Sequence, residues 1–112
     1  MPLPIFVTLR AGEIDRAYVD TPTDLRLSAP SDDAMPVTCI TKSASLPDAV
    51  VWNIGEAKAP NLPDIGEGEW RRYVCVEAAA VAEPVLIKPG EVYTASQTLT
   101  AGVPPADASA GQ

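Results

Sequence analysis

The stretch Arg71-Arg-Tyr-Val-Cys-Val-Glu-Ala-Ala79 has the β-branched and aromatic composition of a strand, and the rest of the chain reads as strands and loops around it. Side chains on a strand alternate between its two faces. One face would be purely apolar and would have to pack, with Val74, Val76 and Ala78. The other face would carry Tyr73, Cys75 and Glu77. The stretch therefore predicts a strand that places one carboxylate beside a thiol and an aromatic ring.

Glu77 is the candidate catalytic residue of this strand. A carboxylate among apolar neighbours loses hydration, which favours its protonated form and suits it to act as a general base. The alternative is a strand-end glutamate that is exposed to water or paired with an arginine, since charged residues are seldom buried without a partner or a task. The residues alone leave both interpretations open and favour the exposed or paired glutamate.

Length and charge limit what the chain can do. It has 112 residues, the size of one small domain with a single core. The formal net charge is −7, and the eight Lys and Arg residues are dispersed. An acidic chain lacks the sequence-independent attraction to phosphate backbones on which nucleic-acid binding depends. We therefore expect no nucleic-acid partner.

The apolar runs and the cysteines also narrow the protein class. No apolar run approaches the roughly 20 residues of a membrane-spanning helix, and the N-terminus has no signal-peptide pattern. We expect a soluble, cytoplasmic protein with no membrane partner. Cys39 and Cys75 each lie in an apolar, strand-like run, where a free cysteine behaves as a small hydrophobic residue. Two such residues make neither a disulfide framework nor a metal site.

The chain contains no histidine. This excludes histidine-dependent triads and most transition-metal sites. Acidic pairs such as Asp32-Asp33 have no calcium-loop spacing and are more simply solvated turns, and Gly66 and Gly68 lie in an acidic setting that would repel phosphate. We therefore expect no metal and no cofactor.

Short strands account for most of the remaining sequence before position 54. Apolar alternation and β propensity predict strands at 5–9, within 13–20, at 25–27, at 37–41 and at 49–53, the last as a buried central strand. Asp15 and Arg16 offer a local charge pair of structural kind.

Residues 54–69 form the longest irregular segment, a candidate rim for a site, with one helical turn at 56–59 before Pro60. Strands are expected again at 70–80, 84–87 and 92–101, with a turn at 88–91 between the last two. The tail 102–112 should be disordered, so the folded domain is expected to span 1–101. Seven or eight short strands without a normal helix indicate an all-β fold, an antiparallel β-sandwich or part of one.

Seven short motifs follow one another along the chain: Glu13-Ile-Asp-Arg-Ala-Tyr18, Val50-Val-Trp-Asn53, Leu62-Pro-Asp64, Trp70, Tyr73-Val-Cys-Val-Glu-Ala78, Pro89-Gly90 and Ser96-Gln-Thr98. In order and approximate spacing, they resemble the C-terminal part of the glucose-6-phosphate 1-epimerases. These hexose-phosphate mutarotases have the galactose-mutarotase-like superfold, so the resemblance implies the C-terminal portion of that supersandwich. It covers residues 10–101, and the second and fifth motifs together make it specific.

The resemblance implies interconversion of the α and β anomers of a hexose 6-phosphate through the ring-opened aldehyde. The family's general base, which takes the proton of the anomeric hydroxyl, falls on Glu77. Trp52 and Asn53 match the family's strand and its exit, and their implied role is to bind substrate by shaping the floor of the site. The family usually continues with proline, whereas Ile54-Gly55 follows here.

The family's acid, a histidine, and its phosphate-binding arginines lie before the matched region. We therefore expect either a fragment that supplies Glu77 to a composite site with a separate N-terminal half, or a catalytically incomplete β-sandwich module that binds a sugar or a protein. Missing strands would leave unpaired sheet edges and an uncovered apolar face, so we also expect marginal stability or self-association.

Overall fold

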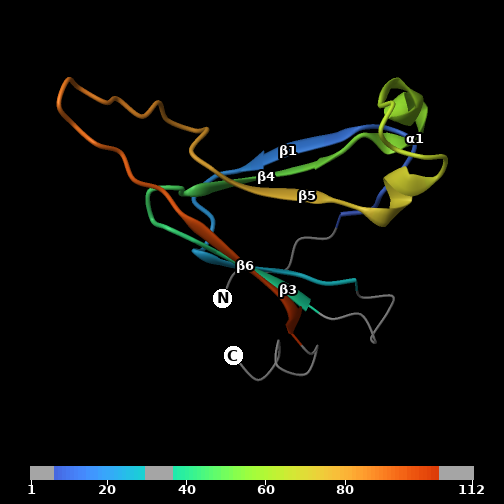
Figure 1. The fold of residues 1–112 in the computed structure, drawn as a ribbon, viewed down its shortest axis with the longest axis horizontal. Coiled ribbons are helices and arrows are strands. Elements are labelled where there is room, and N and C mark those ends of the chain that lie inside the picture. Colours follow the sequence, from blue (N-terminus) through green and yellow to red (C-terminus); the bar gives the residue numbers. More distant parts are fainter. Residues whose placement is uncertain (1–6, 30–36, 104–112) are drawn as a thin grey trace. The chain divides into compact units, whose positions relative to one another are not determined.

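The computed structural model describes residues 7–29 and 37–103. Two compact units form, one from residues 7–18 and 50–77, the other from the described parts of 19–49 and 78–103. Each unit is centred on one three-stranded sheet (Figure 1). The all-β prediction is confirmed, since the helical segments are single turns.

The first sheet has the order β1-β4-β5, with β1 at Ile14–Tyr18, β4 at Asp48–Asn53 and β5 at Cys75–Ala79. The strand predicted within 13–20 and the central strand predicted at 49–53 are both confirmed. Ile14 of β1 is 1% exposed, and Trp70 is 8% exposed. These two side chains and Ile54 form the buried apolar part of the first unit.

Strand β5 is shorter than predicted, because the segment before it is helical. Trp70 lies in the 3₁₀ turn η2, Glu69–Arg72, which follows Gly68 in the left-handed region at φ +75°. Trp70 is the buried residue of this turn, and its side chain anchors the turn. The guanidinium of Arg71 lies 5.5 Å from the centre of the Trp70 ring. A large aromatic residue stabilises by burial in either conformation, so its β propensity did not decide the local structure.

The segment between β4 and η2 contains α1 at Gly55–Lys58 and the 3₁₀ turn η1 at Ala59–Asn61. The predicted helical turn is confirmed, since α1 ends at Lys58, before Pro60, which lies in the first turn of η1. Proline is tolerated in a first helical turn, where its missing N–H has no partner to lose. No helix among the described residues is long and apolar enough to cross a membrane.

The second sheet has the order β2-β3-β6, with β2 at Asp24–Leu27, β3 at Val37–Lys42 and β6 at Gln97–Val103. Both pairings are antiparallel: Leu25 faces Ile40 and Leu99 faces Ile40 from the other side, with an irregularity between Val37 and Cys39. The strands predicted at 25–27 and 37–41 are confirmed.

The C-terminal predictions are less accurate. Residues 84–87 do not form the predicted strand, and the last strand begins at Gln97 and not at Val92. The turn at 88–91 is confirmed, with the Glu91 N–H donating to the Lys88 carbonyl at 2.9 Å. Of the predicted strand at 5–9, residues 7–9 are not in a strand and the first two lie outside the described residues. Of the predicted disordered tail 102–112, residues 102 and 103 belong to β6, so this part of the prediction is wrong, and residues 104–112 lie outside the described residues.

One buried carboxylate ties together distant segments of the second unit. Asp48 is 1% exposed and accepts hydrogen bonds from the backbone N–H groups of Ala82 at 2.9 Å, Val81 at 2.8 Å and Asp20 at 3.1 Å. These three donors, and then the nearby charge of Lys42, lower the pKa of Asp48, although burial opposes the shift. Sequence reasoning missed this residue; an aspartate opening an otherwise apolar strand was the available signal.

Candidate functional site

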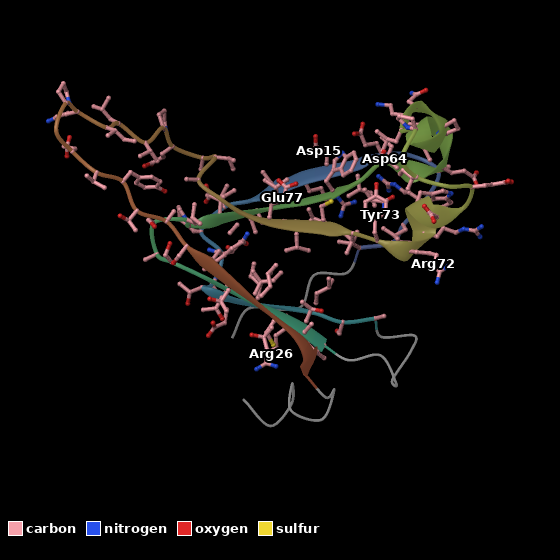
Figure 2. All side chains as sticks on the ribbon, viewed as in Figure 1. Asp15, Arg26, Asp64, Arg72, Tyr73 and Glu77 are labelled. Atoms are coloured by element: carbon pink, nitrogen blue, oxygen red, sulfur yellow. The ribbon has the colours of Figure 1, made fainter. Side chains whose placement is uncertain are left out.

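Glu77 lies in the middle of β5 and is exposed to solvent (Figure 2). Figure 2 also shows Arg72 and Tyr73 where the helical turn η2 leads into this strand. The expectation that Glu77 would be desolvated is wrong for this chain. Its strand neighbour on the same face, Cys75, is small and only half-buried, so it does not shield the carboxylate from water.

Cys75 and Glu77 interact electrostatically along β5. Burial raises the pKa of the Cys75 thiol, and the negative charge of Glu77 raises it further. Both effects disfavour the thiolate, so Cys75 is a neutral, weakly nucleophilic group. Cys39 and Cys75 are both free, as expected from the sequence.

Trp52 is oriented by a small polar network on the first sheet. Its indole N–H donates to Glu13 Oε2 at 2.8 Å, and Lys58 Nζ donates to the other oxygen, Oε1, at 2.8 Å. The pKa of Glu13 is lowered, first by the hydrogen bond from Lys58 and then by that from Trp52, while Glu13 raises the pKa of Lys58. The Trp52 and Tyr73 rings lie 6.2 Å apart at 45°. Carboxylate and aromatic neighbour together fix the indole from two sides.

The sequence pattern indicates a charge pair between Asp15 and Arg16 and does not single out Glu13. Both are exposed, and among the described residues the ion pair that forms is Lys58–Glu13, not the local pair. Adjacent residues on a strand point to opposite faces, so a pair at successive positions within β1 is geometrically disfavoured.

Asn53 is fully buried and its amide group is used by the backbone. Its Nδ2 donates to the carbonyls of Trp70 at 2.8 Å and Tyr73 at 3.0 Å, and its Oδ1 accepts from the Gly55 N–H at 3.0 Å. The Tyr73 hydroxyl accepts from the Ile54 N–H at 3.3 Å. Asn53 therefore holds the exit of β4 against the entry to β5; direct contact with substrate stays a prediction for Asn53 and for Trp52.

Gly55 permits a close approach between the start of α1 and residues 10–12. It has φ +77°, and a Cβ there would lie 2.6 Å from the Gly12 carbonyl carbon and oxygen and 2.8 Å from the Ala11 oxygen. The Ala57 N–H donates to the Ala11 carbonyl at 3.0 Å across this contact. The absence of a side chain at Gly55 thus allows residues 10–12 to lie next to α1.

Two hollows in the described part of the chain lie away from Glu77. One, of about 430 Å³, is lined by residues that include Glu56, Pro60 and Trp70. The other, of about 320 Å³, includes the carboxylates of Asp48 and Glu83 in its lining. The candidate site is therefore an open strand face, with Glu77 on β5 and Trp52 on the adjacent β4, and not an enclosed pocket.

Comparison with known proteins identifies the family of the chain. The family model described as "Aldose 1-epimerase" matches residues 2–100. A protein of Cenchrus ciliaris described as "Putative glucose-6-phosphate 1-epimerase" is 36% identical over 90 residues, which are 80% of this chain and 26% of the relative. The chain thus spans about a quarter of the length of this curated relative. No solved structure gives a significant match. With its strand-borne glutamate and its two antiparallel sheets, the chain belongs to the aldose 1-epimerase family, whose β-sandwich class was expected from the sequence.

Proposed function

We propose that this chain contributes the general base to the interconversion of the α and β anomers of a hexose 6-phosphate. The observation that carries the proposal is the position of Glu77: a solvent-accessible carboxylate on a sheet strand, in a chain of the aldose 1-epimerase family. The description of the Cenchrus ciliaris relative as a glucose-6-phosphate 1-epimerase supports glucose 6-phosphate as the substrate to test first. A strand in a three-stranded sheet holds a catalytic group more firmly than a loop would.

In the proposed reaction, the Glu77 carboxylate accepts the proton of the anomeric hydroxyl. The electron pair of that O–H bond forms the C1 carbonyl, the bond between C1 and the ring oxygen breaks, and the ring oxygen takes up a proton from an acid. Rotation about the bond between C1 and C2 presents the other carbonyl face, and the reverse steps close the ring. A bound sugar would cover Glu77 and exclude water from its carboxylate, so the exposure of Glu77 in the free chain is compatible with this role.

The strand next to Glu77 carries a side chain that suits a sugar. The Trp52 indole, held by Glu13 and Tyr73, offers a flat apolar surface on the neighbouring strand, and sugar rings present C–H faces that pack on such surfaces. The acid is not a histidine of this chain, which has none. The resemblance implies that it comes from an earlier part of the sandwich, and lack of one member of an acid–base pair typically costs a factor of about 100 to 10,000 in rate.

The test is magnetisation-exchange NMR of the two anomer signals of glucose 6-phosphate with the chain at high concentration. We expect exchange above the buffer rate, loss of that excess in Glu77→Gln, and its retention in Glu83→Gln, a matched change at another exposed glutamate. Equal acceleration by the Glu77→Gln and unsubstituted chains would refute the role of Glu77.

A second candidate function is a non-catalytic β-sandwich module that binds a sugar or a protein. It is favoured by the chain's coverage of only 26% of this relative. The resemblance implies that the acid and the phosphate-binding groups lie outside the matched region. The same NMR samples decide between the two: line broadening of the sugar signals without any exchange, unaffected by Glu77→Gln, would support the binding module.

A further inference from the structure

Residues 80–96, here called the apolar arm, connect β5 to β6 and form a long excursion without strand or helix (Figure 1). The arm is nevertheless held in a defined shape. At its tip the Lys88 N–H donates to Glu91 Oε1 at 3.0 Å and closes the turn. At its base the Ser45 hydroxyl donates to the Thr94 carbonyl at 2.7 Å, and the Tyr93 hydroxyl donates to the Ser45 carbonyl.

The arm carries most of the exposed large apolar side chains. Of the eight such residues in the described part of the chain, six lie on the arm. Val92 is 87% exposed, Leu86 79% and Ile87 54%. A soluble monomer rarely displays so many neighbouring apolar side chains on one element unless they contact something else.

Among the described residues, no further strand pairs with the outer edge of β6, the strand that follows the arm. β6 is at the end of the sheet order β2-β3-β6, and residues 97–102 are all exposed. From Val92 to Val103 the sequence contains no charged residue and no proline. Proteins normally protect a free sheet edge with charged residues or proline, or they cover the edge with another segment. An uncharged edge strand next to an apolar arm therefore points to a covering polypeptide.

We propose that the apolar arm and the free edge of β6 form a docking surface for the portion of an aldose 1-epimerase that has no counterpart in this chain. About three quarters of the Cenchrus ciliaris relative falls in that portion, since the match covers 26% of it. A strand-rich polypeptide can both pair with the β6 edge and bury the arm. A second copy of this chain fits less well, because each copy carries a net charge of −7 and the two would repel.

This surface does not depend on Glu77 acting as a base, so the two proposals are tested separately. The chain, with an affinity tag, is co-expressed with the Cenchrus ciliaris polypeptide from which the 90 matched residues have been removed. We expect a soluble 1:1 complex by size-exclusion chromatography with light scattering. Its formation is read as binding, whether or not the complex interconverts sugar anomers.

The combined variant Leu86→Ser/Ile87→Ser/Val92→Ser should weaken this complex by about a hundredfold or more, because each change removes apolar contact area. Val19→Ser is the matched control. Val19 lies outside the arm, and its exposed fraction of 56% is similar to the 54% of Ile87. This substitution should change the dissociation constant by less than about threefold.

Three outcomes would overturn the proposal. The chain alone could form a dimer that the arm variant dissolves, which would make a second copy the occupant. It could remain monomeric and fail to bring the complementary polypeptide into the soluble fraction. Finally, the complex could form with equal affinity in the arm variant and in Val19→Ser, which would place the contact elsewhere.

Discussion

Replacement of Gly55 by alanine should destabilise the first unit through two separable effects. The backbone has φ +77°, and an L-residue with a Cβ in this left-handed region costs about 1–2 kcal/mol. The new Cβ would also lie 2.6 Å from the Gly12 carbonyl carbon and oxygen. These are backbone atoms and cannot rotate away, so the segments must separate, at a cost of about 1–3 kcal/mol by analogy with overpacked cores.

Gly90→Ala provides the control that isolates the second effect. Gly90 has φ +84°, close to that of Gly55, but a Cβ there would meet nothing within 4 Å. Both substitutions also reduce the conformational entropy of the unfolded chain by the same amount. The difference between the two variants in free energy of unfolding is therefore the steric term alone, about 1–3 kcal/mol.

The measurement is urea denaturation followed by circular dichroism, with both variants and the unsubstituted chain at one protein concentration. Thermal melting gives an independent reading, since 1 kcal/mol shifts the midpoint by about 4–8 °C in a domain of this size. Equal losses in Gly55→Ala and Gly90→Ala, within about 0.5 kcal/mol, would refute the close approach of α1 to residues 10–12.

Two further predictions follow from charged groups. Because the pKa of Asp48 is lowered below its ordinary value of 3.8, its stabilising contribution is present above that value and is lost as the pH falls through the folded-state pKa. The difference in free energy of unfolding between the unsubstituted chain and Asp48→Asn, measured by urea denaturation, should therefore shrink from pH 6 to pH 3. A constant difference would contradict the three hydrogen bonds from backbone N–H groups to Asp48. Burial and then the negative charge of Glu77 raise the pKa of the Cys75 thiol. In a Cys39→Ser background, the Cys75 thiol should therefore react faster with iodoacetamide at pH 8 when Glu77 is replaced by glutamine. An unchanged rate would show that the side chains of Cys75 and Glu77 do not interact.

The accuracy of the sequence-based strand predictions follows the physics of each segment. β3 was predicted almost completely because four of its six residues are β-branched and three of the six are buried. Residues 84–87 also contain two β-branched residues, Val85 and Ile87, but form no strand. They have no neighbouring strand in the described chain, and β propensity without a hydrogen-bonding partner does not stabilise a strand.

The candidate site shows the same division. Glu77 was found because a short motif and a family resemblance both lead to it, but its exposure depends on what covers β5, which a local pattern does not encode. Glu13 was missed because its partners are distant in sequence: Trp52 is 39 positions away and Lys58 is 45. Asn53 was found for its motif, and only its hydrogen bonds show that it holds backbone.

The sequence by itself determined the all-β class, the main strands of both sheets, the family and the choice of Glu77, since alternation, β propensity and motif order are all local properties. Tertiary structure alone decided that Trp70 ends in a 3₁₀ turn, that Asp48 binds three distant N–H groups, and that the apolar arm is left exposed. The physical reason is that burial and hydrogen bonding depend on partners brought together from far along the chain, and these contacts outweigh the small conformational preferences of individual residues.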